Sequence, residues 1–290
     1  MSSDFTLPGY QPEVIAEDGD RYPLIYWLNT TKLGGVVGAW HTGDFSELPA
    51  PWSRVERFDN EEHGFETQSL TFVPLRMRQQ WYLNYTTPQG DTVIKAVPHY
   101  MDAVSGKTFL EKHGGGMYLG IRSASQVLAM VQGIDRPVVV QTKGMVAMHA
   151  FKRVTKKSPG GEVYRMVNAM LGVANQTRKG ADLIPHFAFW VTLKTPLNAK
   201  GKIATAEVGA GAIIVYPQLD MKPEDITREH LVQRFVGREK LQLAHAMYLD
   251  GEAWANEPPR NDFAGGVVEP PPAPQAHNTP QPIDDADSPF

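Results

Sequence analysis

The chain has 290 residues, of which 42% are hydrophobic and 10% aromatic, a composition that supports at least one substantial buried core. It contains no cysteine, which excludes disulfides, iron–sulfur clusters, Cys-ligated zinc and thiol nucleophiles and favours a reducing compartment. The sequence has neither a signal-peptide pattern nor a run of about 18 apolar residues, so we expect a cytoplasmic location without a membrane partner.

Charge is distributed unevenly along the chain, although the formal net charge is only −4. Residues 101–200 carry 14 Lys and Arg against 5 Asp and Glu, whereas residues 251–290 carry 1 against 7. A basic middle followed by an acidic end is typical of proteins that bind a polyanion. A basic face that contacts only solvent would give the same pattern.

Strand patterns dominate the first 220 residues. β-branched and aromatic runs bounded by Gly, Pro or Asn predict strands at residues 22–29, 35–40, 69–73, 79–85, 93–97, 137–140, 187–193 and 206–216. The polar stretch 59–66 predicts an exposed loop. Apolar residues at helical spacing predict helices at residues 123–132, at 161–174 and from Pro223 to about Asp250, where Gly237 divides two helices.

The carboxyl-terminal segment differs in character from the rest of the chain. Residues 256–290 contain nine prolines and few large apolar residues, which predicts a disordered linker that is locally extended as polyproline II. The segment ends in a peptide that combines three carboxylates with two apolar anchors, and its partner-binding residues are expected to be Ile283, Asp284, Asp285, Asp287, Pro289 and Phe290. Such a peptide can insert its aromatic ring in a pocket while basic side chains hold its carboxylates.

This ending resembles that of bacterial and phage single-stranded-DNA-binding proteins. In that family a folded DNA-binding body is followed by a proline- or glycine-rich linker and an acidic tail ending in an aromatic residue, in the bacterial proteins in Pro-Phe. The matching residues are Asp284, Asp285, Asp287, Pro289 and Phe290, so the resemblance covers about the last ten residues. It implies binding of single-stranded DNA without strong sequence preference and recruitment of replication, recombination or repair proteins by the tail.

We therefore expect an α+β, mainly β protein in three parts. Residues 1–220 would form an elaborated oligonucleotide-binding (OB-like) barrel, as in the phage or mobile-element versions of the family. The prevalence of strands without regular βαβ alternation fits such a barrel. Residues 221–255 would form helices that pack on the body or mediate homo-oligomerisation, and residues 256–290 would form the linker and tail.

Single-strand binding without sequence preference needs cations for the phosphates and flat side chains on which bases stack. The residues expected to supply them are Arg76, Arg78, Trp81, Tyr82, Tyr85, Lys143, Lys152, Arg153, Lys156, Lys157, Arg178, Lys179 and Trp190. Aromatic residues in strands can instead belong to the core, and lysines before a Pro-Gly-Gly turn can instead serve only solubility.

No catalytic motif is complete in the sequence. The run from His113 to Gly116 resembles an esterase oxyanion loop, but no Gly-x-Ser-x-Gly elbow accompanies it, so it predicts a turn. The Gly106-Lys107-Thr108 sequence resembles the end of a phosphate-binding loop, but Met101 stands where its first glycine is required, so it predicts a hairpin connection.

One cluster of polar residues is compatible with a metal-dependent reaction. Glu61, Glu62, His63 and Glu66 could ligate a metal ion, as in a nuclease. The expectation is nevertheless a non-catalytic protein with no metal or other cofactor. The alternatives are a phage structural or assembly protein whose tail docks to its own kind and, with less support, a metal-dependent nuclease.

Overall fold

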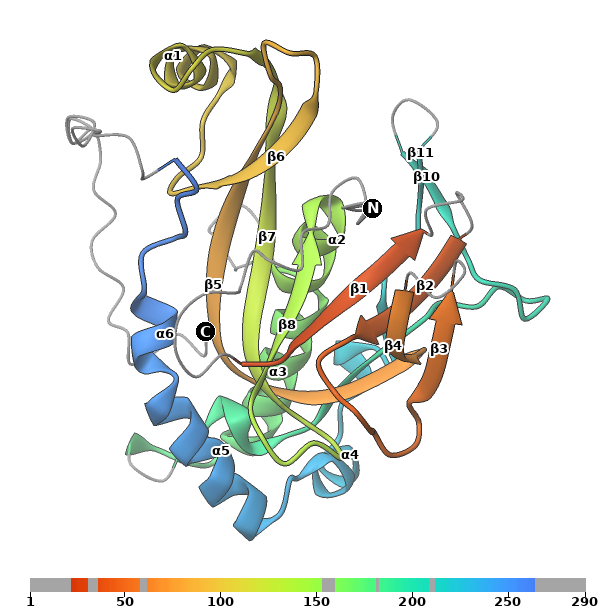
Figure 1. Ribbon diagram of the computed structural model, residues 1–290. Coiled ribbons are helices and arrows are strands. Elements are labelled where there is room, and N and C mark those ends of the chain that lie inside the picture. Colours follow the sequence, from red (N-terminus) through yellow and green to blue (C-terminus); the bar gives the residue numbers. More distant parts are fainter. Residues whose placement is uncertain are drawn as a thin grey trace. The chain divides into compact units, whose positions relative to one another are not determined.

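The structure is a computed structural model that describes residues 22–30, 36–57, 62–152, 160–180, 183–208 and 212–263. Its fold is α+β and mainly β, with a 10-stranded mixed sheet and a separate two-stranded sheet (Figure 1). The chain divides into two compact units. Unit 1 comprises Met1–Gln79 and Ser123–Glu257, and unit 2 comprises Gln80–Arg122 and Pro258–Phe290.

Unit 1 contains most of the large sheet. Its complete strands are β1 (Leu24–Thr30), β2 (Val36–Thr42), β3 (Ser53–Arg57), β4 (Glu62–Thr67), β8 (Val138–Lys143), β9 (Val191–Lys194) and β12 (Gln218–Leu219). Two long strands, β5 (Ser69–Thr86) and β7 (Met117–Val131), each have one end in unit 1 and the other in unit 2. The strand order is β12-β9-β5-β7-β8-β1-β2-β4-β3, and β1 pairs in parallel with β8 but antiparallel with β2.

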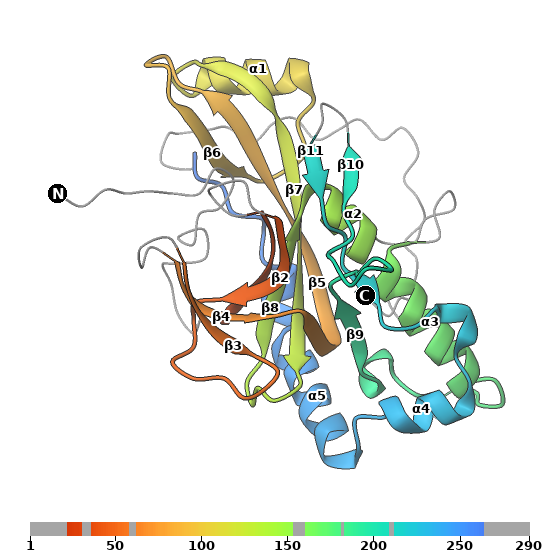
Figure 2. The same cartoon turned by 90° about the vertical axis from the view of Figure 1, so that its right-hand side faces the viewer.

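The central strands of the sheet in unit 1 are buried on both faces, and successive side chains of a strand point to opposite sides. Val73 and Leu75 of β5 pack in a cluster with Ala244 and Met247 of α5 (Arg238–Asp250), whereas Phe72 contacts Phe151 of α2 (Gly144–Phe151). Figure 2 shows α2 and α3 (Glu162–Ala174) beside the central strands, away from α5. Two buried faces explain the nearly continuous apolar runs in these strands.

The remaining elements of unit 1 are short. They are the hairpin of β10 (Ala206–Val208) and β11 (Ala212–Ile214), two 3-10 turns (His186–Ala188 and Pro223–Asp225), α4 (Arg228–Arg234) and α6 (Glu252–Asn256). The helices expected at residues 161–174 and 223–250 are confirmed as α3 and as α4 with α5. Among the described residues, no helix combines the length and the apolar character needed to cross a bilayer.

Several expectations about local structure were wrong. The strand expected at residues 206–216 is instead the pair of antiparallel strands β10 and β11. Residues 123–132 form the end of β7 rather than a helix, because pairing of Ala124–Ala129 with β8 outweighs the helix propensity of Ala, Leu and Met. Residues 62–66 form part of strand β4 rather than a loop, and Gly106-Lys107-Thr108 lies inside a helix rather than in a hairpin. Of residues 187–193, only the last three lie in a regular strand.

Unit 2 has its own small core. It consists of the far end of β5, β6 (Thr92–Val97), the near end of β7, α1 (Ala103–Lys112) and the segment 258–263. Phe263 packs with Leu83, Tyr85 and Leu110, and the Asp262 carboxylate accepts a hydrogen bond from the backbone N–H of Ala96 at 2.7 Å. The segment just before the tail is therefore folded with this unit. Residues 264–290, including the whole acidic tip, lie outside the described residues.

Candidate functional site

Arg76 and Arg78 of β5 both contact the carboxyl-terminal helices. The guanidinium group of Arg78 donates hydrogen bonds to the Gln126 side chain at 2.9 Å, the Trp254 carbonyl at 3.0 Å and the Glu257 carboxylate at 2.8 Å. Arg76 donates to the Tyr248 carbonyl at 3.0 Å and lies 3.6 Å from the Glu252 carboxylate. These interactions hold α5 and α6 on the sheet, and binding of DNA by the two arginines stays a prediction.

The aromatic residues expected to stack on bases lie mostly in packed environments. In unit 2, Tyr82 and Tyr85 are buried and Trp81 packs edge-on against Tyr100, with ring centroids 5.3 Å apart. In unit 1, Trp190 is half-buried against the core, and the Lys240 ammonium group lies 5.4 Å from its ring centroid. These rings contribute to packing, and their expected stacking on DNA is untested.

Two of the expected lysines lie at opposite ends of one helix. Lys143 is the residue before α2 and Lys152 is the residue after it. The eight residues of α2 rise about 1.5 Å each, so the two backbone positions lie roughly 13 Å apart. Arg153, Lys156 and Lys157, which continue the basic cluster in the sequence, lie outside the described residues.

Between these lysines, α2 presents flat and polarisable side chains. Met145 and Met148 are 52% and 47% exposed, and the rings of His149 and Tyr216 lie 4.9 Å apart at 48°. The Tyr216 hydroxyl lies 3.9 Å from the Met145 sulfur. We call this set the α2 surface, and its members are Lys143, Met145, Met148, His149, Lys152 and Tyr216.

The sheet holds the parts of the α2 surface in place. The chain turns from β8 directly into α2 at Gly144, whose φ of +56° lies in the left-handed region that favours glycine. The backbone just before Tyr216 is fixed by β1. The Trp27 indole N–H donates to the Val215 carbonyl at 2.9 Å, and the Asn29 side chain accepts from the Val215 N–H at 2.6 Å. The surface therefore rests on rigid elements.

Sequence reasoning found the two lysines of the α2 surface but missed the residues between them. The overlooked signal is the spacing of Met145, Met148 and Lys152, which places them on one side of a helix. Tyr216 gave no such signal, because a contact with His149 across 67 positions depends on the tertiary fold.

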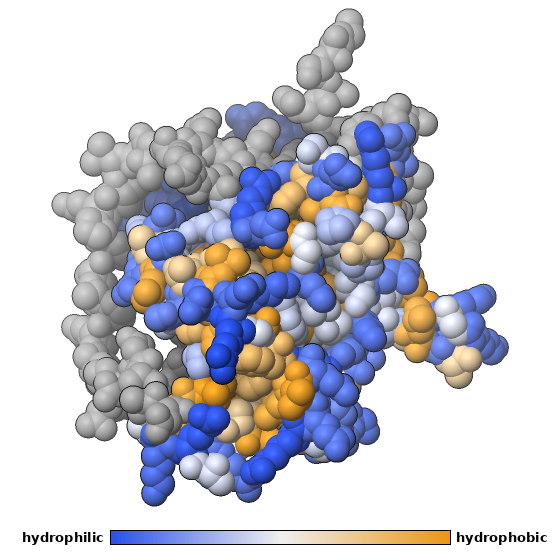
Figure 3. Space-filling view, turned by 90° about the horizontal axis from the view of Figure 1, so that it is seen from below, coloured by the Kyte–Doolittle hydropathy of each residue, from blue (hydrophilic) through white to orange (hydrophobic). Residues whose placement is uncertain are grey.

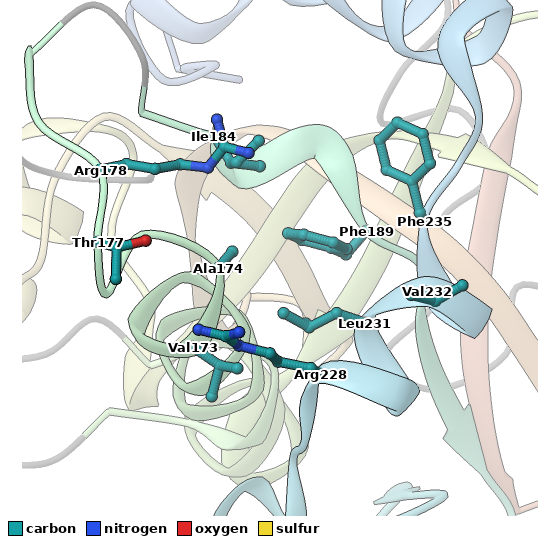
Figure 4. Close-up of a pocket in the computed structure, with 10 residues that line it drawn as sticks. All are labelled: Val173, Ala174, Thr177, Arg178, Ile184, Phe189, Arg228, Leu231, Val232 and Phe235. Atoms are coloured by element: carbon teal, nitrogen blue, oxygen red, sulfur yellow. The ribbon is translucent and has the colours of Figure 1, made fainter.

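A pocket of about 450 Å³ lies elsewhere in unit 1 (Figure 4). Seven apolar residues and one threonine line it together with two arginines: Val173, Ala174, Thr177, Arg178, Ile184, Phe189, Arg228, Leu231, Val232 and Phe235. Phe189 and Leu231 are buried and point inward, whereas Val232 is 77% and Phe235 38% exposed at the rim. The view from below shows groups of hydrophobic residues exposed among the hydrophilic ones (Figure 3).

The pocket walls are joined by backbone and amide hydrogen bonds. The Asn175 side chain, at the end of α3, accepts from the Ile184 N–H at 2.7 Å and donates to the Ile184 carbonyl at 3.1 Å. Opposite, Phe189 forms an antiparallel bridge with Phe235, and the Trp190 N–H donates to the Arg234 carbonyl at 2.8 Å. Of the residues expected from sequence, Arg178 borders this pocket, and the neighbouring Lys179 is exposed.

The metal-ligand cluster considered in the sequence is described only in part. Glu66 is buried in β4, and its carboxylate lies 3.4 Å from Nδ1 of the buried His41. Glu61 and the side chains of Glu62 and His63 lie outside the described residues. Within the residues that the structure describes, no three potential ligands are gathered around one point. The His41–Glu66 pair joins the adjacent strands β2 and β4.

The acidic tail residues Ile283, Asp284, Asp285, Asp287, Pro289 and Phe290 lie outside the described residues. Comparison of the chain with protein-family models, curated protein sequences and solved structures gives no match.

Proposed function

We propose that the protein binds single-stranded DNA without strong sequence preference and recruits replication, recombination or repair proteins through its acidic tail. The observation that carries the proposal is the α2 surface, where Lys143 and Lys152 flank the paired rings of His149 and Tyr216. Lysines neutralise phosphates, partly exposed aromatic rings offer stacking contacts that do not depend on base identity, and exposed thioethers offer apolar contacts. The α2 surface lies within residues 143–216, largely in the basic segment 101–200, whose composition is consistent with a polyanion partner.

Within this proposal, the mainly β body is an elaborated OB-like fold, as the tail resemblance implies. The protein acts in the cytoplasm without catalysis and without a cofactor. Its organisation as a binding body of residues 1–220, a helical segment and a linker with a tail stays a prediction.

The experiment is a titration of the full chain with an oligothymidine strand over a range of salt concentrations, followed by tryptophan fluorescence. We expect saturable binding whose affinity falls steeply with salt. Replacing Lys143 and Lys152 with Ala should weaken binding and reduce the magnitude of the salt slope by about 0.7 for each phosphate that is no longer neutralised. Lys222→Ala, at an exposed lysine before the second 3-10 turn, is the matched control and should leave the slope unchanged.

The stacking contribution is tested by two variants at one position. Tyr216→Ala should cost about 1–3 kcal/mol of binding free energy, whereas Tyr216→Phe retains the ring and should bind nearly as well as wild type. No binding at any salt concentration would overturn the proposal in favour of a structural or assembly protein. Magnesium-dependent cleavage of the strand would instead indicate a nuclease.

The tail is tested separately. Removal of residues 284–290 should retain or tighten DNA binding, because the acidic segment mimics a phosphate backbone, and should abolish recruitment of partner proteins. Unchanged partner binding by the truncated protein would contradict the proposed role of the tail.

A further inference from the structure

The pocket between α3 and α4 has an apolar side and a cationic side. In Figure 4 the guanidinium groups of Arg178 and Arg228 lie toward Thr177. The buried side chains of Phe189 and Leu231 lie on the opposite side. Among the described residues that line the pocket, none is acidic. The lining therefore favours a ligand with an apolar body and a negatively charged end.

Arg228 has hydrogen-bond donors available for such a ligand. On the same two helices, Arg165 donates to the Glu162 carboxylate at 3.0 Å and Arg234 donates to the Asp220 carboxylate at 2.6 Å. The side chain of Arg228, by contrast, makes no hydrogen bond or ion pair with another residue that the structure describes. The planar guanidinium group matches a carboxylate, which it can bind through two parallel N–H donors. A ligand carboxylate can therefore bind Arg228 without displacing another described residue.

The apolar side of the pocket is held in place by backbone pairing. Phe189 and Phe235 form an antiparallel bridge, and the Val236 N–H donates to the Ala188 carbonyl at 3.1 Å. A pocket that is already formed loses less conformational entropy when a ligand binds. Its volume of about 450 Å³ lies in the lower part of the range for small-molecule sites, about 300–1,000 Å³. The size suits one small molecule.

We propose that this pocket binds a small amphipathic anion, an apolar chain or ring that ends in a carboxylate. The apolar part packs on Phe189 and Leu231, where its removal from water stabilises the complex. The carboxylate is held by Arg228, and Arg178 adds positive charge at the same end. The pocket shares no residue with the α2 surface, so this binding goes beyond the proposed function and holds whether or not that surface binds DNA.

The direct test uses anilinonaphthalene sulfonate, an aromatic anion whose fluorescence rises in an apolar site, with the full chain and without DNA. Binding of the dye should be saturable, and octanoate, kept below its micelle concentration, should displace it. Octanol, which lacks the charge, and acetate, which lacks the chain, should each bind about tenfold more weakly than octanoate. Equal displacement by octanoate and octanol, or no displacement by octanoate, would overturn the proposal.

Protein variants test the assignment to this pocket. Arg228→Gln removes the positive charge, and Val232→Asp places a carboxylate at the rim. Each should weaken octanoate binding about tenfold, and both residues are exposed, so the fold should survive either change. Arg238→Gln is the matched control, because Arg238 is the exposed first residue of α5 as Arg228 is of α4. Equal weakening in Arg228→Gln and Arg238→Gln would show a general charge effect and overturn the assignment.

Amide hydrogen exchange locates the ligand without any substitution. Saturating octanoate should slow exchange of the Ile184 and Trp190 N–H groups, whose acceptors are the Asn175 side chain and the Arg234 carbonyl in the pocket walls. Exchange in β6 of unit 2 should change less. Saturable binding without added protection at Ile184 and Trp190 would place the ligand elsewhere and overturn the proposal. Because no step involves DNA, failure here is distinguishable from failure of the oligothymidine titration.

Discussion

The guanidinium group of Arg78 lies 4.3 Å from the ring centroid of Trp254 and also donates a hydrogen bond to the carbonyl of that same residue at 3.0 Å. Two positions earlier on β5, Arg76 repeats the arrangement with Tyr248, at 3.7 Å from the ring centroid and 3.0 Å from the carbonyl. Each arginine thus holds one aromatic residue of α5 or α6 by its ring and by its backbone. The pair fixes both helices to one face of the sheet.

Arg78→Lys should lower the free energy of unfolding by about 1–3 kcal/mol, because an ammonium group cannot replace a guanidinium that serves several acceptors at once. Urea unfolding measures the change. Arg54→Lys is the control, since among the described residues Arg54 forms a solvent-exposed ion pair with Glu56 at 3.8 Å and no other ion pair, and it should cost less than about 0.5 kcal/mol. Equal effects of the two substitutions would contradict a structural role for Arg78.

Gly251→Ala should destabilise the junction of α5 and α6. A Cβ atom at this position would lie 2.3 Å from Cδ2 of the buried Leu128 and 3.1 Å from the Met247 carbonyl oxygen, so we expect a loss of about 1–3 kcal/mol from overpacking. Gly172→Ala, inside α3 with open space around it, should instead stabilise the protein by about 0.5–1 kcal/mol. Thermal unfolding of the two variants should shift in opposite directions.

Stability should fall as the pH drops from about 6.5 toward 4. Burial and, to a smaller extent, the nearby Arg76 charge lower the pKa of His186 from 6.5 to about 4, and the hydrogen bond between its ring nitrogen and the Leu75 carbonyl oxygen, 3.1 Å away, opposes them. In this window the unfolded chain binds a proton that the folded protein does not, so protonation favours unfolding. Protonation of His186 should lower the free energy of unfolding by about 2 kcal/mol between pH 7 and pH 4.5.

His186→Gln isolates that contribution, because glutamine can donate to the same carbonyl but does not titrate. Urea unfolding at pH 7 and pH 4.5 should show a smaller loss of stability for His186→Gln than for wild type. Parallel pH profiles for the two proteins would exclude His186 as the source of the dependence.

Tyr85→Ala should destabilise unit 2, because the Tyr85 side chain is buried and its ring centroid lies 6.0 Å from that of Phe263. Truncation of a large buried ring costs about 3–5 kcal/mol. Tyr100→Ala, at a 57% exposed ring in the same unit, is the control and should have little effect. Amide hydrogen exchange in β6 reports the difference, and equal protection in both variants would contradict the assignment of Tyr85 to the core.

The sequence predicted the class of fold and most of its elements, because β-branched runs and helical spacing reflect local preferences. It predicted separate strands at residues 69–73 and 79–85, whereas the structure has one strand of 18 residues, β5, in which Arg76 and Arg78 contact α5 and α6. It mistook residues 123–132 for a helix, because Ala, Leu and Met favour helices until pairing with a neighbouring strand outweighs that preference.

Less of the candidate site than of the fold could be predicted from the sequence. Lys143 and Lys152 stood out by charge, but Tyr216 joins His149 only through the hydrogen bonds that β1 makes to the segment before it. The pocket could not be predicted from the sequence either, because Phe189 and Phe235 come together through a β-bridge between distant parts of the chain. Such sites arise from tertiary contacts that no local pattern records.

The α2 surface also makes the protein sensitive to oxidation. The chain has no cysteine but 11 methionines, so thioethers are its sulfur groups open to oxidation, and Met145 and Met148 stand half-exposed on this surface. Conversion to the sulfoxide would place a polar oxygen where a soft apolar atom now lies, and methionine sulfoxide reductases can reverse the change. An oxidant in the cell would thus act on the proposed DNA-binding surface while leaving the buried core of the sheet unaltered.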